Sequence, residues 1–212
     1  MVSMRSSVLL GVLAVLVARP SMAGEVTPGW CVVPSHIALV GSQVGRSDEG
    51  GQFTVVVTRF GNPVNAAAVV IDYSNCTDLV ICSAQLDPGV TVGCATDRKY
   101  VRKFTDMTGT VSFTVLGGSN GTGNATTLPG GARIYANGVL IGSPSVSAYD
   151  LDGVAGVGIN DLAVWMNDFG SGETWGRSDL DGSGTVGIND LAMWLEVYGA
   201  GTSSVGCANS CP

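Results

Sequence analysis

The chain has few of the side chains on which most enzyme mechanisms depend. Its 212 residues include one histidine, His36, whereas an HExxH zinc site needs two. As a lone residue at the edge of an expected strand, His36 is more typical of a structural position than of the base of a hydrolytic triad. The sequence also contains no Walker loop and no dinucleotide fingerprint, and most of its C-terminal acids fall in the loops described below. We therefore expect a protein that is not an enzyme.

Positive charge is also scarce. The chain has 10 Lys and Arg against 17 Asp and Glu, a net charge of −7, and no basic patch suited to nucleic acid. Residues 24–148 are nearly balanced, with eight acids and seven bases, whereas residues 149–199 hold nine acids and one base, Arg177. The acidity therefore belongs to the C-terminal segment, and no nucleic-acid partner is expected.

Only one long apolar run is present, and it lies at the start of the chain. Arg5 precedes the apolar residues Ser7–Ala18, and Ser21-Met22-Ala23 fits the small-x-small cleavage rule. The run is short for a bilayer span. We expect residues 1–23 to be a signal peptide and the mature chain, from Gly24, to be secreted, extracellular or at the cell surface, without a membrane span.

Six cysteines follow that segment, and an even number in an exported chain favours disulfides. Sequence alone does not choose among the pairings, although Cys207 and Cys211 could close a small terminal loop. The alternative of a zinc site has neither a CxxC spacing nor more than one histidine in its favour. The cysteines are Cys31, Cys76, Cys82, Cys94, Cys207 and Cys211.

The segment 24–148 has the pattern of an all-β domain. Short runs rich in Val, Thr, Ile, Phe and Tyr are separated by Gly, Pro, Asn and Asp, and Asn137-Gly138 predicts a type I′ hairpin turn. We expect a two-sheet antiparallel sandwich, with Gly117–Gly131 as a flexible surface loop. The expected strands are Ile37–Val40, Phe53–Phe60, Ala68–Tyr73, Lys99–Phe104, Thr110–Leu116, Ala132–Tyr135, Val139–Ile141 and Ser145–Ala148.

Two similar acidic loops dominate the C-terminal segment. DLDGVAGVGIND covers residues 150–161 and DLDGSGTVGIND covers residues 179–190. Each is followed by apolar residues at i, i+3, i+4 and i+7, which predicts a helix with one apolar stripe, and each stripe is followed by a glycine, Gly170 or Gly199. The two helices could bury their stripes against each other. The stripes are Leu162, Trp165, Met166 and Phe169, and Leu191, Trp194, Leu195 and Tyr198.

The second loop has the ligand spacing of a calcium site. Calcium takes about six to eight oxygens, and a loop of this length offers them from positions 1, 3, 5, 7, 9 and 12. Gly184 occupies position 6, where the chain turns sharply, and Gly187 at position 9 would act through water. An acidic, glycine-rich turn that only caps a helix is the alternative interpretation. The expected ligands are Asp179, Asp181, Ser183, the Thr185 carbonyl and Asp190.

The first loop is the weaker candidate. Asp150, Asp152 and Asp161 occupy positions 1, 3 and 12, but Val154 replaces the oxygen at position 5 and Ala155 replaces the glycine. One ligand fewer and a strained turn predict a lower affinity.

Paired loops of this kind, each followed by one helix, resemble a type I dockerin over about residues 148–199. The resemblance implies EF-hand-like calcium sites and a cohesin-like partner. In cellulosomal dockerins, loop positions 10 and 11 are Ser-Thr and the helix carries basic residues. Here those positions hold Ile159-Asn160 and Ile188-Asn189, and Val164 to Asp168 contains no Lys or Arg. The metal site therefore matches better than the partner surface does.

The β segment is similar to bacterial Ig-like domains of the invasin/intimin kind. Its matches are the turns Gly61-Asn62-Pro63-Val64 and Thr105-Asp106-Met107-Thr108-Gly109, while the cysteine-bearing insert Asn75 to Cys94 departs from the pattern. This resemblance implies an extracellular spacer or adhesive module.

Together these features predict a mainly β fold: an Ig-like antiparallel sandwich at 24–148, a small all-α dockerin-like unit at 149–199 and a cysteine-containing tail at 200–212. The expected function is a secreted, non-catalytic calcium-binding interaction protein that docks to a cohesin-like partner or to itself. The alternatives are a structural subunit whose calcium unit only stabilises its own fold, and an accessory protein of polysaccharide degradation with carbohydrate or cell-surface contacts. Complete burial of Trp165 and Trp194 would favour the structural alternative.

Overall fold

A computed structural model describes residues 25–40, 50–95, 98–120, 131–154, 156–172, 176–199 and 210–211. The expected signal peptide and the part of the glycine-rich segment at 121–130 lie outside the described residues. No helix among the described residues is long and apolar enough to cross a membrane.

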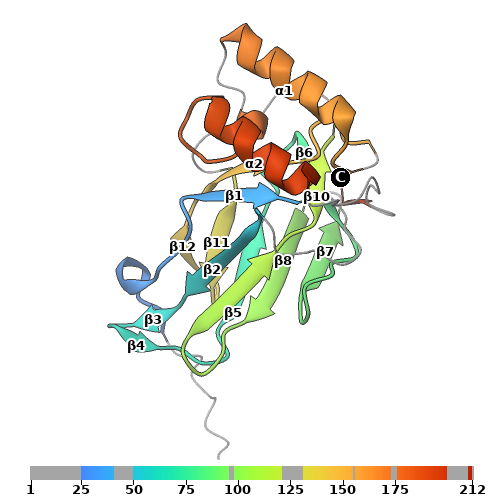
Figure 1. Ribbon diagram of the computed structural model, residues 1–212. Coiled ribbons are helices and arrows are strands. Elements are labelled where there is room, and N and C mark those ends of the chain that lie inside the picture. Colours follow the sequence, from blue (N-terminus) through green and yellow to red (C-terminus); the bar gives the residue numbers. More distant parts are fainter. Residues whose placement is uncertain are drawn as a thin grey trace, which may run out of the picture.

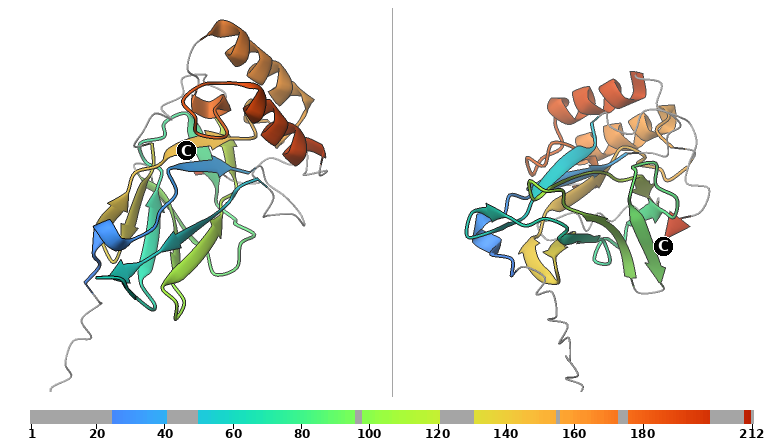
Figure 2. Two further views of the ribbon diagram at one scale, coloured as in Figure 1. Left: turned by 60° about the vertical axis from the view of Figure 1, so that its left-hand side comes forward. Right: turned by 90° about the horizontal axis from the view of Figure 1, so that it is seen from below.

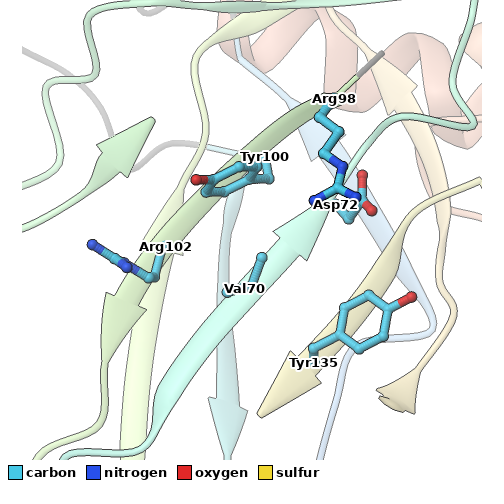
Figure 3. Close-up of a pocket in the computed structure, with 6 residues that line it drawn as sticks. All are labelled: Val70, Asp72, Arg98, Tyr100, Arg102 and Tyr135. Atoms are coloured by element: carbon cyan, nitrogen blue, oxygen red, sulfur yellow. The ribbon is translucent and has the colours of Figure 1, made fainter. Parts of the chain in front are cut away.

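The largest sheet is antiparallel and has the strand order β12-β11-β5-β8-β7. One face of it packs into the main core, and the other carries an open hollow (Figure 3). Its strands are β12 (Val139–Gly142), β11 (Arg133–Ala136), β5 (Ala68–Asp72), β8 (Arg98–Phe104) and β7 (Thr91–Ala95).

Four smaller sheets complete the described β body, and all of them except the β3–β4 pair contribute residues to its core. The pairs β2–β9 and β3–β4 and the three-stranded order β10-β6-β14 are antiparallel, whereas β1 and β13 pair in parallel. These strands are β1 (His36–Leu39), β2 (Gln52–Val56), β3 (Thr58–Arg59), β4 (Asn62–Pro63), β6 (Leu79–Cys82), β9 (Thr110–Thr114), β10 (Gly117–Ser119), β13 (Ser145–Ala148) and β14 (Ser210–Cys211).

Two helices cover one end of the β body, as Figures 1 and 2 show. They are α1 (Ile159–Ser171) and α2 (Ile188–Gly199), and the short 3-10 turns η1 (Pro28–Trp30) and η2 (Gly176–Ser178) complete the described helical structure. Helix α1 does not stop at Gly170, as predicted, but continues to Ser171. The glycine that caps its C-terminus is Gly172, which adopts a positive φ of 68°.

The described chain is mainly β, as predicted, but the predicted architecture is wrong. The strands form five small sheets in place of the two of an Ig-like antiparallel sandwich, and one strand pair is parallel. A parallel pair needs a long connection, and nearly the whole β body separates β1 from β13 in sequence.

The C-terminal segment also does not form the predicted all-α dockerin-like unit: it contributes a helix pair that shares a core with strands. Trp194 and Val197 of α2 pack in one buried cluster with Val40 after β1, Leu116 before β10 and Tyr149 after β13. The sequence showed the apolar stripe of each helix but not that a strand would supply the surface beneath it.

All eight expected strands have counterparts, and the predicted hairpin turn is confirmed. Asn137 and Gly138 both adopt positive φ, 49° and 82°, between β11 and β12. The prediction missed β4, β6, β7, β10 and β14, and the glycine-rich segment begins as a buried strand rather than as a surface loop.

Of the cysteine pairings that the sequence left open, the small terminal loop closed by Cys207 and Cys211 is not formed. Cys211 is bonded to Cys94, which joins β14 to the sheet edge strand β7. Cys82 is disulfide-bonded as well, whereas Cys31 and Cys76 are free thiols. Burial raises the pKa of the Cys76 thiol to about 12, so this thiol is an inert part of the core.

Candidate metal centres

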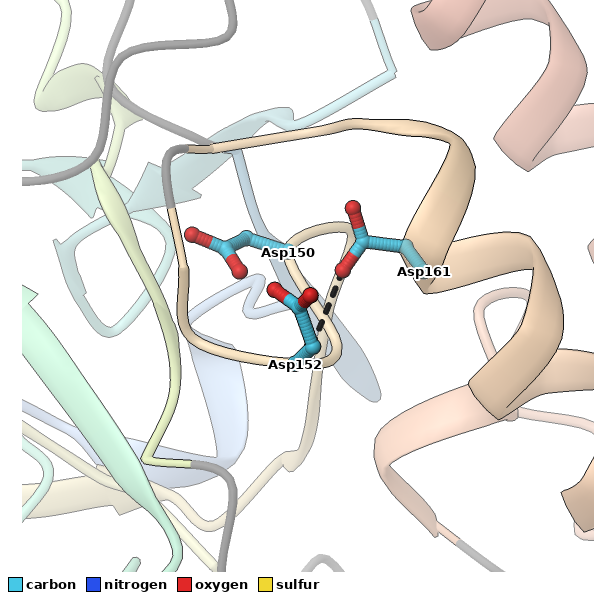
Figure 4. A group of neighbouring side chains, drawn as sticks. All are labelled: Asp150, Asp152 and Asp161. Carbon is cyan, nitrogen blue, oxygen red and sulfur yellow. Dashed lines mark hydrogen bonds between the residues drawn. The ribbon is translucent and has the colours of Figure 1, made fainter.

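Two clusters of three aspartates lie in the loops that precede α1 and α2. In each cluster the three residues offer carboxylate oxygens that lie within 4.8 Å of one another. Figure 4 shows the carboxylates of Asp150, Asp152 and Asp161 of the first cluster side by side within the loop. Like charges at this separation are unfavourable unless a cation compensates them, so each cluster could hold a metal ion. The second cluster is Asp179, Asp181 and Asp190.

In each loop the carboxylate of the aspartate at position 12 accepts hydrogen bonds from backbone N–H groups of the loop. In the second loop Asp190 Oδ1 accepts hydrogen bonds from the backbone N–H of Leu180 (2.7 Å) and Asp181 (3.0 Å). Its Oδ2 accepts one from the Gly187 N–H (2.6 Å). Asp190 thereby fixes both ends of the loop, and it is almost completely buried.

The remaining predicted ligands of the second loop lie near the same point. Asp179 accepts hydrogen bonds from the Ser183 N–H (2.9 Å) and the Gly184 N–H (2.8 Å). The Ser183 hydroxyl lies 3.4 Å from Asp179 Oδ1 and 3.1 Å from the Thr185 carbonyl oxygen. Gly184 has a φ of 90°, as expected for the sharp turn. Carboxylate, hydroxyl and carbonyl oxygens therefore lie close together in this loop.

The first loop repeats this arrangement despite its weaker sequence. Asp161 accepts hydrogen bonds from the N–H groups of Leu151 (2.6 Å), Asp152 (2.9 Å) and Gly158 (2.6 Å). The Val154 side chain contributes no oxygen and is 66% exposed. A positive φ falls on the glycine at position 7 of this loop. Position 5 of this loop therefore offers no side-chain oxygen.

Burial and the charges of neighbouring aspartates make Asp150, Asp161 and Asp179 harder to ionise without a cation. Burial, followed by the nearby charge of Asp161, raises the pKa of Asp150 to about 7. Burial also raises the pKa of Asp161 and of Asp179. A bound cation would reverse this by favouring the charged forms.

The first loop is pressed against β10, a contact that sequence reasoning missed. The Ser119 N–H donates to the Asp150 carbonyl oxygen (2.7 Å). A Cβ on Gly118 would lie 2.9 Å from the Asp150 carboxyl group, and one on Gly153 would lie 2.4 Å from the Ser119 carbonyl oxygen. Small residues on both sides therefore allow the loop to approach the strand. In the sequence, the run of small residues Gly117-Gly118-Ser119 is the feature that could have indicated this close contact.

The second loop is pressed against β1 at His36. The His36 ring hydrogen-bonds to the hydroxyls of Ser145 and Ser147, each at 2.8 Å. A Cβ on Gly182 would lie 2.6 Å from His36. Burial lowers the pKa of His36 to about 4, against an opposing effect of Asp181. His36 is a packing residue beneath the loop.

A buried ion pair links α1 to the start of the second loop. The Arg177 guanidinium donates to both carboxylate oxygens of Asp168, each at 2.8 Å, and the Ser178 hydroxyl donates to the same group at 2.5 Å. Arg177 is the single base of the acidic segment. Its charge is therefore used by Asp168 and does not neutralise either aspartate cluster.

The apolar stripes of the helices do not bury each other as predicted. Trp165 and Trp194 are buried, at 3% and 0% exposure, and the Trp194 ring N–H donates to the Tyr149 carbonyl oxygen. Met166, with 61% exposure, lies on the rim of an apolar groove of about 400 Å³ between the helices. The groove is lined by Leu162, Trp165, Met166, Phe169, Ile188, Leu191 and Leu195.

Comparison with known proteins gives no match to a protein-family model, to a curated protein or to a solved structure. The function is therefore inferred from the two clusters and the groove.

Proposed function

We propose that this chain is a secreted, non-catalytic calcium-binding protein that docks to a protein partner. Two calcium ions would hold the loops, the loops would fix α1 and α2, and the groove between the helices would receive the partner. The observation that carries the proposal is the apolar groove, which stays exposed directly beside two buried aspartate clusters. Exposed apolar surface of this kind is typical of interaction sites.

Calcium is the ion that best suits the donor set. Both clusters offer only oxygen, and the second adds a hydroxyl and a backbone carbonyl. Such hard ligands favour calcium or magnesium over zinc or copper. Magnesium demands near-octahedral geometry, whereas calcium accepts the irregular set of carboxylates and carbonyl that a loop of this length provides.

The proposed partner is a cohesin-like module, as the dockerin resemblance implies, or a second copy of this chain. The groove is apolar along its length, with Met166, Phe169 and Leu195 about half exposed or more. An apolar side chain from a partner would fill it, in the manner of a buried interface anchor.

A second candidate is a purely structural role for the helix pair. The burial of Trp165 and Trp194 and the shared core with Tyr149 favour it, because the metal would then stabilise only this chain. The two functions differ in whether the groove is ever covered.

The test uses Met166→Asp in the groove and Met107→Asp as its control, since Met107 is 83% exposed in a turn far from α1 in sequence. Self-association is measured by sedimentation, and partner capture by pull-down from the source organism's secretome, each with calcium and with chelator. If the chain docks to a partner, a complex should form with calcium and be lost with chelator. Met166→Asp should weaken that complex at least about tenfold, and Met107→Asp should leave it intact. Equal behaviour of the two variants would favour the structural role.

A further inference from the structure

The outer face of the five-stranded sheet carries a basic and aromatic surface that the proposed function does not use. A hollow of about 440 Å³ opens on it (Figure 3). We call its lining the arginine–tyrosine face: Val70, Asp72, Arg98, Tyr100, Arg102 and Tyr135.

Strand register brings these side chains together from three adjacent strands. Tyr135 of β11 pairs with Val70 of β5, which pairs in turn with Arg102 of β8. In the next row Asp72 of β5 pairs with Tyr100 of β8. Since side chains alternate along a strand, the intervening residues point into the core. These fully buried residues are Val69, Ile71, Val101 and Ile134. The face is therefore positioned by a rigid sheet.

The Tyr100 ring lies flat across the neighbouring strand. It covers Gly93 of β7, its direct partner in the ladder, where a Cβ would lie 2.2 Å from the ring. Only a glycine permits this position. Figure 3 shows Tyr100 and Tyr135 on opposite sides of Val70, so the hollow has an aromatic ring at each side and an apolar floor.

The charge of the face is opposite to that of the whole chain. Arg98 and Arg102 line the hollow, and Arg133 stands directly opposite Asp72 in the register. Asp72 is the single acid there, and its Oδ1 already accepts from Ser74. Among the described residues none of these arginines forms an ion pair. The face therefore attracts anions although the chain carries −7.

Arg102 gives the strongest indication that this face binds a ligand. Its guanidinium lies over the Phe104 ring at 5.5 Å. Its Nε is buried and has no hydrogen-bond partner within the described part of the chain. A buried donor without an acceptor is costly, and an anionic group in the hollow would supply that acceptor.

We propose that the arginine–tyrosine face binds an acidic polysaccharide. Its sugar rings would lie against Tyr100 and Tyr135, and its carboxylate or sulfate groups would accept hydrogen bonds from Arg98 and Arg102. Arginine suits this role because its planar fork donates two parallel hydrogen bonds to such groups. The spacing of aromatic and basic groups over three strands suits an extended chain of repeating charge better than a small isolated anion.

A polysaccharide fits better than a nucleic acid. Nucleic-acid binding draws most of its affinity from many phosphate contacts, and this face offers three arginines on an otherwise acidic chain. Single-stranded DNA is therefore included as an outcome of the test.

The experiment measures binding of the full chain, in calcium-containing buffer of low ionic strength, to four probes: alginate, dextran sulfate, neutral dextran and oligo-dT. The first two separate carboxylate from sulfate recognition. The variant is Arg98→Gln with Arg102→Gln, and the matched control is Arg59→Gln, an exposed arginine that neighbours Glu25 instead. Tyr100→Ala and Tyr100→Phe test the ring, and thermal melting verifies that each variant is folded.

We expect binding to at least one acidic polysaccharide and none to neutral dextran. The double arginine variant should weaken it by about tenfold or more, with Arg59→Gln close to wild type. Tyr100→Ala should weaken binding and Tyr100→Phe should preserve it. The proposal is overturned by absence of polysaccharide binding, by tighter binding of oligo-dT, or by equal effects of the arginine variant and its control. Binding that persists in the double variant and disappears with chelator would also overturn it, because loop calcium would then bridge the polymer.

Discussion

The first and second acidic loops share a hydrogen-bonded frame although they differ in the middle. Asp161 and Asp190 each accept three backbone hydrogen bonds, from the residues at positions 2, 3 and 9 of their loops, at 2.6 to 3.0 Å. The acid at position 1 is buried in both loops. The frame is therefore set by positions 1 and 12, and it tolerates changes at positions 5 and 6.

The loops differ in the oxygens they add to that frame. Ser183 places a hydroxyl beside Asp179 and the Thr185 carbonyl, whereas Val154 turns an apolar side chain to solvent. The fold of a loop and its ligand count are therefore separate properties. The second loop should bind calcium more tightly, although both should keep their shape.

The largest effect should come from breaking the stronger loop. Asp179→Ala with Asp190→Ala should abolish the calcium response of the second loop, whereas Asp150→Ala should do less. A ligand at about 100 times its Kd stabilises the native state by about 2.7 kcal/mol, and the variant also leaves buried N–H groups unpaired. Thermal melting with and without calcium measures the loss, and calorimetry counts the ions.

The control for this pair is Glu196→Gln, which removes an acid of α2 outside both clusters. It should leave the calcium response unchanged. A full response in the double alanine variant would mean that the first loop is the stronger site.

The next effect concerns pH and follows from the raised pKa of Asp150. Without calcium, the native state holds a proton on Asp150 up to about pH 7, whereas the unfolded chain releases it near pH 4. Between these values the native state binds more protons, so the stability of the metal-free protein should fall as pH rises. Calcium binds the charged form and removes that loss.

The calcium-induced rise in Tm should therefore increase between pH 5 and pH 7.5, by a few degrees. Melting scans across this range with calcium and with chelator measure it, and Asp150→Asn should flatten the metal-free curve. A calcium effect independent of pH would show that these carboxylates are already charged in the metal-free state.

Sequence reasoning located the loops because their acids stand at fixed positions relative to a helix. It also placed eight strands, since short runs rich in β-branched and aromatic residues, separated by turn residues, mark them. It failed for β10, where Gly117, Gly118 and Ser119 have no strand propensity. Those residues form a strand because β6 and the Asp150 backbone supply the hydrogen-bond partners.

The same reasoning could not assign the cysteines or place the helices. Cys94 and Cys211 lie 117 residues apart, and only the fold brings β7 and β14 together. The apolar stripe containing Trp194 predicted a buried helix face, but the face beneath it is built from strands far away in sequence. Long-range contacts of this kind leave no periodic pattern.

A smaller effect should come from disturbing the contact between the first loop and β10, a strand that the second loop does not contact in this way. Gly118→Ala would place a Cβ 2.9 Å from the Asp150 carboxyl group, so the first loop should lose calcium affinity while the second keeps it. The matched control is Gly29→Ala, where a Cβ meets nothing within 4 Å. Calorimetry should show one weakened site, at a cost of about 1 to 2 kcal/mol. Equal weakening of both sites would mean that the loops are coupled through the helices.

The smallest effect should come from exchanging position 5 between the loops. Val154→Ser should give the first loop the hydroxyl that Ser183 supplies in the second, and Ser183→Val should remove it there. Each change alters one neutral ligand and leaves the position-12 frame intact, so we expect a several-fold change in calcium affinity, about 1 kcal/mol. Calorimetry on both single variants and on the double exchange measures it. In the double exchange the calcium affinity of the first loop should approach or exceed that of the second. If the second loop remains the tighter site, its higher calcium affinity comes from the glycine at position 6 or from the packing of the loop against His36, and not from the number of ligands.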